Sequence, residues 1–306
     1  MSLDDSYLRY PKRQYGMDHE HYTWSMLSER KAVTWPNQAN LAVWVNINIQ
    51  LYPLNQQKNA VAVPGGLTMP YPDLRHYSLR DYGNRVGIYR ILKALDQYSI
   101  TPTIAINGAM VEKAPYLMDL IRERGDEVIA HGWKMDELHS GELEPEAEKD
   151  RITRTIETLQ NRFQNRISGW LSPGRLQTRH TQRLLVEQGI HYNCDWVNDD
   201  MPYHFNTDRG KIICLPLSNE LDDFFVLNNN LHRTESYAEQ MEDACDFLLN
   251  EATQNGGRLL ALNIHPWLMG QPHRIAAFER ILAHIASQQK IFNASARDII
   301  AAWENQ

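Results

Sequence analysis

The stretch Glu127-Val128-Ile129-Ala130-His131-Gly132-Trp133-Lys134-Met135-Asp136 joins a short apolar run to a histidine and a glycine. The run predicts a buried strand, and the loop after such a strand is where α/β enzymes place catalytic groups. A lone histidine at a strand end is more often structural than catalytic. This segment therefore indicates an α/β protein and gives one candidate site residue.

The same pattern recurs near the C-terminus. There the apolar run Leu259-Leu260-Ala261-Leu262-Asn263-Ile264 continues into His265-Pro266-Trp267. The carboxyl ends of parallel strands meet at one face of a barrel, where active sites of such folds lie. We therefore expect His131 and His265 to face one common site.

Strand-like and helix-like segments alternate along the chain after about residue 40. Strands are predicted at 41–49, 103–106, 127–130, 167–171, 191–194, 211–215, 258–264 and 290–293. Helices are predicted at about 88–95, 115–124, 152–163, 178–188, 236–253, 272–287 and 296–303. This alternation predicts a parallel sheet curled into a barrel. We expect one domain over 1–306, with an N-terminal extension (1–40) and a long loop insertion (52–84) ordered over the mouth or against a partner.

Composition excludes several classes of partner. The chain has 31 basic and 38 acidic residues, a net charge of −7, which disfavours nucleic acid and anionic lipid. No apolar run approaches the roughly 20 residues of a membrane span, and the start lacks a secretory signal. The three cysteines show neither zinc nor disulfide spacing. These features predict a cytoplasmic protein, and the two aromatic-rich additions predict a homo-oligomer.

Several blocks appear in the order found in one enzyme family. They are Asn46 and Asn48, His131-Gly132-Trp133, Gly169-Trp170-Leu171-Ser172-Pro173-Gly174-Arg175, Asn198-Asp199-Asp200-Met201-Pro202-Tyr203 and His265. Over about residues 40–300 the chain resembles the polysaccharide deacetylase (NodB-homology, carbohydrate esterase 4) family. With Arg80-Asp81-Tyr82-Gly83-Asn84-Arg85-Val86-Gly87, it is most similar to the branch that includes the cofactor-independent allantoinase.

The resemblance implies a distorted (β/α)7 barrel that hydrolyses a carbon–nitrogen bond outside peptides. In usual members an aspartate pair ends the first strand, where one aspartate acts as base and the other holds a divalent metal together with a His-x-x-x-His pair. Here Asn46 and Asn48 stand at the aspartates, and Met135 at the second histidine. Neutral amides and thioethers are poor zinc ligands. We therefore expect no cofactor; any zinc would be held weakly, by His131 with Asn48 or His139.

Without an aspartate at position 46, another group must activate water. The catalytic candidates are His131, His265, Asp199 and Asp200, with Asp136 and Glu137 left open. Adjacent carboxylates can raise the pKa of one of them, although Asn-Asp-Asp-Met-Pro is also favourable turn chemistry.

Candidate substrate-binding residues surround these groups along the sequence: Arg175, Trp133, Asn46, Asn48 and Trp267. Arg175 offers a bidentate donor, with a surface ion pair as the alternative. The tryptophans would wall the site, with core packing as the alternative.

Two functions follow from this pattern. The first is hydrolysis of a small amide or ureide, because a polymer would be hard to reach from the cytoplasm. The second is a non-catalytic barrel that binds a small polar or carbohydrate ligand after losing its metal site. Convergence of a carboxylate and both histidines on one point would favour the enzyme.

Overall fold

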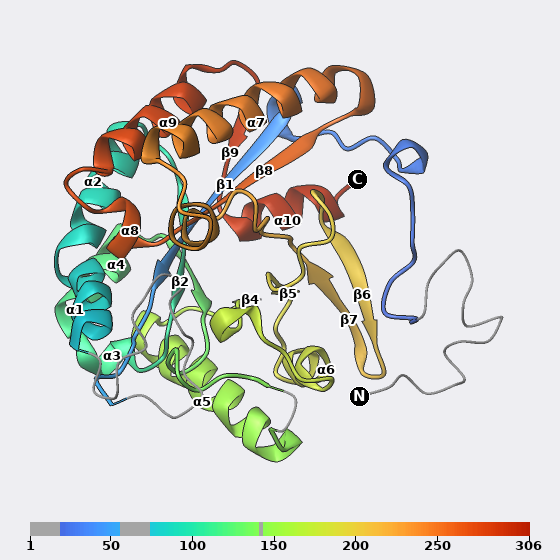
Figure 1. Ribbon diagram of the computed structural model, residues 1–306. Coiled ribbons are helices and arrows are strands. Elements are labelled where there is room, and N and C mark those ends of the chain that lie inside the picture. The colour runs from blue at the N-terminus through green and yellow to red at the C-terminus, as the bar shows by residue number, and fades with distance from the viewer. Residues whose placement is uncertain (1–18, 56–73, 141–142) are drawn as a thin grey trace.

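One sheet organises the part of the chain that the computed structural model describes, which is residues 19–55, 74–140 and 143–306 (Figure 1). Its strands run in the order β6-β7-β5-β4-β3-β2-β1-β8, with β9 beside β1. The bounds are β1 Leu41–Ile49, β2 Pro102–Ile106, β3 Glu127–Ala130, β4 Gly169–Trp170, β5 Tyr192–Asn193, β6 Tyr203–Thr207, β7 Gly210–Cys214, β8 Arg258–Ile264 and β9 Ile291–Asn293.

The sheet is parallel apart from the hairpin of β6 and β7, and it curls into a distorted barrel. The expected fold class is therefore confirmed, whereas strand β6 was not predicted. In the described residues β8 has no ladder with β7; a single bridge between Asp222 and Asn263 spans this side instead. That bridge places the segment after β7 beside the carboxyl end of β8.

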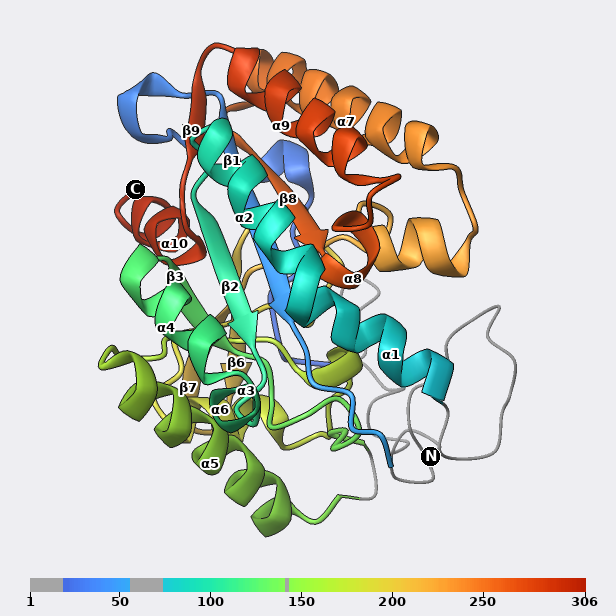
Figure 2. The same cartoon turned by 90° about the vertical axis from the view of Figure 1, so that its left-hand side faces the viewer.

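Helices cover the outer face of the curled sheet, except for α10, which packs against the inner face (Figures 1 and 2). Their bounds are α1 Leu74–Tyr82, α2 Ile88–Gln97, α3 Met110–Lys113, α4 Pro115–Arg124, α5 Pro145–Phe163, α6 Thr181–Glu187, α7 Thr234–Asn255, α8 Pro266–Met269, α9 Ile275–Ser287 and α10 Ala296–Glu304. No helix in the described ranges is long and apolar enough to cross a membrane.

The long loop expected at 52–84 is wrong over its last part. Residues Leu74–Tyr82 form α1, which continues through the π-helical turn Gly83–Gly87 into α2. The sequence concealed α1 because it is mostly polar and buries a single residue, Arg80. Residues 56–73 of the expected loop, and 1–18 of the expected extension, lie outside the described residues.

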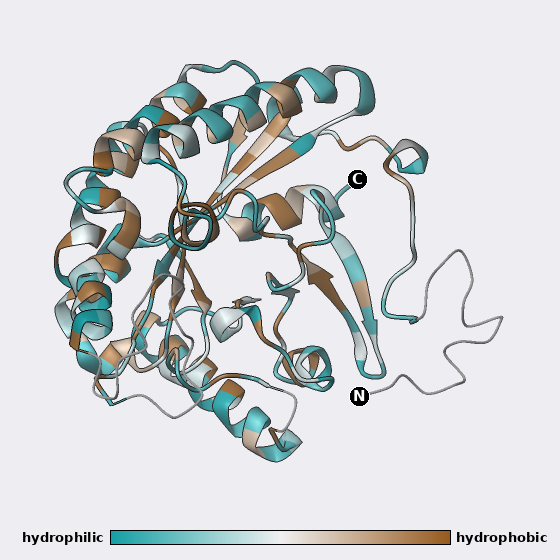
Figure 3. Cartoon of the chain, viewed as in Figure 1, coloured by the Kyte–Doolittle hydropathy of each residue, from teal (hydrophilic) through white to brown (hydrophobic). Residues whose placement is uncertain are grey.

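Alternate residues of each strand enter two apolar clusters on opposite faces of the sheet. In β1, Leu41 and Val43 join the outer cluster under the helices, while Ala42 and Trp44 join the inner one. Figure 3 shows the resulting hydrophobic strands and helix faces toward the sheet. Side chains on a strand alternate with a period of two, so this packing fixes which residues point into the barrel.

The same alternation carries polar residues to the inner face near the strand ends. Asn46 and Asn48 continue the inner row of β1, and Asn263 lies in the corresponding row of β8 beside Asn46. His131 and His265 directly follow β3 and β8. A polar layer therefore forms at the carboxyl end, while Ile299 and other residues of α10 fill the inner cluster below it.

Candidate active site

A cavity of about 160 Å³ opens where the polar layer ends. Both strand-end histidines line it, together with Asn48 and Arg175 from the predicted set. Gln50, Tyr52 and Phe224 also line it, and sequence reasoning had not singled these out. The structure thus brings His131 and His265 to one site at the expected face of the barrel.

His265 is held by a buried carboxylate. Its Nδ1 lies 2.6 Å from Asp223 Oδ1, and its backbone N–H donates to Asp223 Oδ2 at 2.8 Å. Burial raises the pKa of Asp223, and the adjacent His265 offsets part of that rise. With Nδ1–H bound to the carboxylate, Nε2 is the ring nitrogen left for chemistry in the cavity.

His131 is fixed at both ring nitrogens. Its Nδ1 donates to the carbonyl of Leu171 at 2.8 Å, and its Nε2 lies 3.0 Å from the amide nitrogen of Gln50. Burial lowers the pKa of His131 to about 4, so the ring is neutral near pH 7. A neutral ring with Nδ1–H can accept a hydrogen bond from Gln50 at Nε2.

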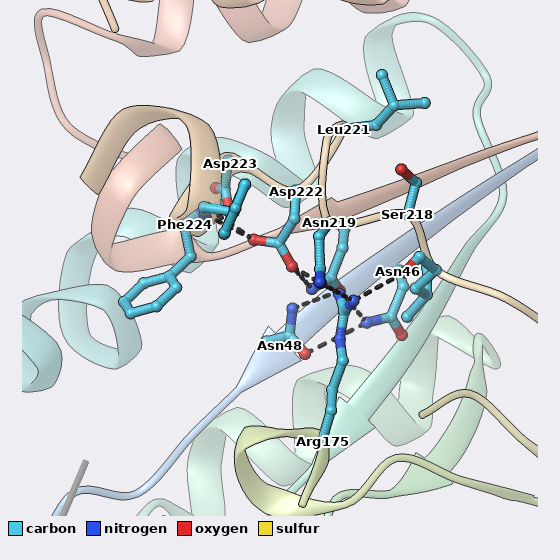
Figure 4. Close-up of polar contacts among 12 residues, drawn as sticks. Asn46, Asn48, Arg175, Ser218, Asn219, Leu221, Asp222, Asp223 and Phe224 are labelled. Atoms are coloured by element: carbon cyan, nitrogen blue, oxygen red, sulfur yellow. Dashed lines mark hydrogen bonds and ion pairs between the residues drawn. The ribbon is translucent and has the colours of Figure 1, made fainter. Parts of the chain in front are cut away.

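Three asparagines and one aspartate form a connected layer at the cavity, and Figure 4 shows Asn46, Asn48 and Asp222 of this layer. Asn46 and Asn48 both donate to Asn263 Oδ1, at 2.6 and 2.8 Å. Asn263 in turn donates to Asp222 Oδ2 at 2.6 Å. The amides of Asn46 and Asn48 are therefore linked to the carboxylate of Asp222 through Asn263, and Asn48 also lines the cavity.

Arg175 completes this layer from the opposite side. Its Nη2 binds Asp222 Oδ2 at 2.6 Å, and its Nη1 donates to Leu217 O and Asn219 Oδ1 (Figure 4). Arg175 has φ of 55°, a left-handed conformation that is uncommon without glycine and often marks a functional constraint. Both terminal nitrogens are thus occupied by the protein itself, so Arg175 positions Asp222 where a substrate clamp was expected.

Asp199 and Asp200 lie outside the cavity, so the structure does not place them near the histidines as expected. Asp199 forms an ion pair with Arg30 at 2.7 Å and caps the backbone of Met201. Asp200 is exposed, and its pKa is raised first by partial burial and then by Asp199. The turn chemistry recognised in the sequence explains this pair, and Asp222 and Asp223 supply the adjacent carboxylates of the site instead.

The two tryptophans differ in position. Trp267 is buried, with its ring centroid 6.1 Å from that of His265. Trp133 does not line the cavity; Arg154 stacks on its ring at 4.0 Å. Of the remaining base candidates, neither Asp136 nor Glu137 lines the cavity, and Glu137 is paired with Arg154 at 2.8 Å.

The residues present do not fit the metal site of the usual family members. His139 does not line the cavity, and its fully buried ring has Nδ1 on Glu148 at 2.9 Å. His131 has both nitrogens engaged. Asp222, Asp223 and His265 have ligand atoms within 4.8 Å of one another, as do Cys245, Asp246 and His284 on α7 and α9.

Neither of these groups offers an open set of ligand atoms. Each oxygen of Asp222 accepts at least two hydrogen bonds, those of Oδ1 from the backbone of Phe224 and Phe225. Both oxygens of Asp223 accept from His265. In the second group Asp246 and His284 are already paired at 2.7 Å near the surface.

The sequence carried a signal for the missed residues. Leu221-Asp222-Asp223-Phe224 shows the same adjacent carboxylates that drew attention to Asp199-Asp200. It follows no predicted strand, however, because the chain reaches this position through an irregular segment after β7. Only the bridge to Asn263 in β8 shows that it belongs to the mouth of the barrel.

Comparisons with known proteins agree with this architecture. Residues 77–193 match the family model for polysaccharide deacetylase. A putative polysaccharide deacetylase of Schizosaccharomyces pombe is 23% identical over 296 residues, which cover 88% of this chain and 92% of the relative.

Two solved structures extend the likeness to the whole fold. PuuE allantoinase superposes with a TM-score of 0.83 at 23% identity, covering 93% of this chain and 98% of its own. A probable polysaccharide deacetylase from Pseudomonas aeruginosa PAO1 superposes with a TM-score of 0.77 at 23% identity, covering 97% and 99%.

Residues 77–193 therefore match the polysaccharide deacetylase class, and the chain shares the distorted-barrel fold of the two solved structures. The class comprises hydrolases of carbon–nitrogen bonds other than peptide bonds. The resemblance of this chain to the allantoinase structure extends over nearly its whole length.

Proposed function

We propose that this protein hydrolyses a small amide or ureide with His265 and Asp223 as its acid–base pair. The observation that carries the proposal is the 2.6 Å contact between His265 Nδ1 and Asp223 Oδ1, with the His265 ring lining the cavity. A carboxylate on Nδ1 fixes the tautomer and stabilises the imidazolium that forms during proton transfer. The small cavity suits a small molecule better than a polymer chain.

The proposed reaction uses water as the nucleophile. Nε2 of His265 takes a proton from a water molecule as its oxygen attacks the carbonyl carbon of the substrate. The same proton is then given to the leaving nitrogen as the carbon–nitrogen bond breaks, which yields an acid and an amine. General acid–base catalysis of this kind contributes roughly 10²–10⁴-fold to the rate.

The negative charge that develops on the carbonyl oxygen needs a hydrogen-bond donor. Arg175 offers a bidentate donor, but its terminal nitrogens already bind Asp222, Leu217 and Asn219. Tyr52 lines the cavity, and burial raises the pKa of its hydroxyl, which keeps the proton on the oxygen. We assign Tyr52 as the donor to the oxyanion, supported by this position.

We propose that the reaction proceeds without a tightly bound metal. The proposal is supported by Asn46 and Asn48, whose amides hold Asp222 through Asn263. It is also supported by Gln50, which occupies Nε2 of His131.

The experiment that tests the function is an assay of metal-stripped protein against ureides, formamides and N-acetylated sugars. We expect turnover of a small substrate that survives chelation, and a loss of about 10²-fold or more in kcat for Asp223→Asn. Asp246→Asn is the matched control, because Asp246 forms a comparable 2.7 Å pair with His284 away from the cavity.

Asp199→Asn distinguishes the two carboxylate pairs. Asp199 lies outside the cavity, so its substitution should leave kcat within about twofold of wild type. A large loss in Asp199→Asn with full activity in Asp223→Asn would return the base role to the pair at 199–200. The metal-free mechanism would be contradicted if the purified protein contained stoichiometric zinc and a chelator removed both the zinc and the activity.

If no substrate of these classes is turned over, the alternative of a binding barrel is favoured.

We further propose a cytoplasmic location, supported by Cys194, Cys214 and Cys245, all three buried and unpaired.

A further inference from the structure

Behind the cavity wall lies a buried arginine that has no carboxylate partner among the described residues. Arg80 of α1 is 3% exposed, and its guanidinium carbon lies 3.8 Å from the ring centroid of Trp267 and 4.4 Å from that of Tyr52. Its one hydrogen bond within the described residues joins Nη1 to His76 Nε2 at 3.3 Å. Buried charged groups are normally paired, so this cation requires an explanation.

The carboxylates of the site are already committed to other cations. Asp222 binds Arg175 at 2.6 Å, and Asp223 binds His265 at 2.6 Å. Burial lowers the pKa of Arg80, and within the described ranges Tyr52 is the group that opposes this shift. The aromatic rings stabilise the guanidinium through cation–π contacts but do not neutralise it. Among the described residues, the positive charge of Arg80 is therefore not paired with a carboxylate.

The unused donors of Arg80 lie on one edge of the guanidinium. Nε is buried without a hydrogen-bond partner, and no described residue accepts from Nη2. Nε–H and one Nη2–H are parallel on that edge, which is the fork that binds two oxygens of a carboxylate or phosphate. The ring contacts of Tyr52 and Trp267 lie at the guanidinium carbon, and among the described residues they leave these two donors without an acceptor.

Arg80 is also close to the reacting groups. Tyr52 and Phe224, both within cation–π distance of Arg80, line the cavity. Trp267, which stacks on Arg80, has its ring 6.1 Å from that of His265. A substrate at His265 would reach Arg80 by extending a second group past Tyr52 and Phe224, beyond the cavity of about 160 Å³ that these two residues line.

We propose that Arg80 binds a carboxylate of the substrate, so that the enzyme selects small amides or ureides bearing a carboxylate. A carboxylate matches both the unpaired charge of Arg80, as the described residues show it, and its two parallel donors. This inference rests on the proposed hydrolase function for its meaning in catalysis, but its binding test does not depend on turnover.

The test compares two probes that differ only in charge, N-acetylglycine and N-acetylglycinamide. Their dissociation constants are measured by calorimetry on the full chain. We expect wild type to bind the carboxylate about tenfold or more tightly, as a desolvated bidentate pair implies. Arg80→Met should abolish this preference, and Arg80→Lys should lose most of it, because a lysine keeps the charge without the fork.

Arg85→Met is the matched control. Arg85 lies five residues further along the chain, is 77% exposed and pairs with Asp81 at 3.7 Å. Its removal changes the net charge equally and should leave the preference intact. Circular dichroism checks folding; if Arg80→Met does not fold, Arg80→Lys and the wild-type comparison decide the outcome.

Equal affinity of wild type for the two probes, or binding of neither, would overturn the inference. Retention of the full preference in Arg80→Met or Arg80→Lys would overturn it as well. If inorganic phosphate competes with N-acetylglycine more strongly than acetate does, the free donors of Arg80 would be assigned to a phosphate instead. A carboxylate preference that depends on Arg80, found without hydrolysis of any amide, would support this inference while refuting the proposed function.

Discussion

His131 shows how burial on the inner face changes the chemistry of one residue. Its pKa is lowered to about 4 by burial, whereas an unfolded chain would titrate near its ordinary value of 6.5. Between these values the unfolded state binds more protons than the folded state. Above about pH 6.5 this group does not lower the free energy of unfolding. As the pH falls from 6.5 toward 4, it lowers the free energy of unfolding by about 3 kcal/mol.

Urea unfolding at pH 4.5 and pH 7.5 measures this linkage. Wild type contains other titrating groups, including Asp223 with its raised pKa, so the comparison is made with His131→Gln. We expect the variant to be less stable at pH 7.5 but to lose less stability on acidification. Equal losses in the two proteins would show that His131 is not the group responsible.

Asn48 and Met135 set the response of the site to metal. Asn48 Nδ2 donates to Asn263 Oδ1 at 2.8 Å and to Ile264 O at 3.1 Å, so Asn48→Asp would place an acceptor against two acceptors. Buried unsatisfied groups of this kind cost about 1–3 kcal/mol, more when charged. We expect Asn48→Asp with Met135→His to be destabilised without metal and restored by zinc, which binds deprotonated ligands.

Thermal melts with and without zinc check this prediction. The double variant should gain melting temperature with zinc, while wild type and Met135→His alone should gain little. A comparable zinc-dependent gain in wild type would mean that the native residues already form a metal site.

At the scale of elements, two glycines decide how closely α1 and α2 approach α8. A side chain on Gly83 would lie 2.7 Å from the backbone nitrogen of Trp267, and one on Gly87 would overlap the carbonyl of Pro266. The π-helical turn Gly83–Gly87 therefore packs backbone against backbone. This contact brings the end of α1, with Arg80, against Trp267.

Gly87→Ala tests this contact by the sign of its effect. In a helix, alanine is ordinarily more favourable than glycine by roughly 1 kcal/mol. Here overpacking against Pro266 should reverse the sign and destabilise the fold by about 1–3 kcal/mol. Chemical denaturation measures the change, with exposed Val86→Ala as the near-neutral control. A stabilised Gly87→Ala would show that the helices have room to separate.

At the scale of the whole molecule, the N-terminal extension leaves apolar residues in solvent. Trp24, Met26 and Leu27 are 55%, 49% and 43% exposed, and neighbouring Arg30 ties this segment to Asp199. Clustered exposed apolar residues usually contact a partner, so we propose a homo-oligomer through this segment. Light scattering should give a mass above the 35.6 kDa of one chain.

Substitution of all three residues by serine should lower that mass to one chain without loss of the folded signal. A wild-type protein that is monomeric at micromolar concentration would contradict the proposal. An oligomer that persists in the triple variant would place the interface elsewhere on the molecule.

Much of the fold could be predicted because its signals are local. The apolar runs of β1 and β8 set the period of side-chain alternation, and that period sent Asn46, Asn48 and Asn263 inward. His131 and His265 follow their strands directly in the sequence, so their meeting at one face followed from parallel pairing alone.

Only the tertiary structure decided which groups bind these residues. Asp223 lies 42 residues before His265, and Asp222 reaches Asn263 from an irregular segment. Asp199-Asp200 and Asp222-Asp223 are equivalent as sequence, yet one pair meets Arg30 and the other meets the cavity. In the sequence, Arg80 is likewise an ordinary polar residue of a helix. Only the structure shows that it is buried between aromatic rings. The physical reason is that burial and neighbouring groups determine the role of a carboxylate or guanidinium. These neighbours come from distant parts of the sequence and meet only in the folded chain.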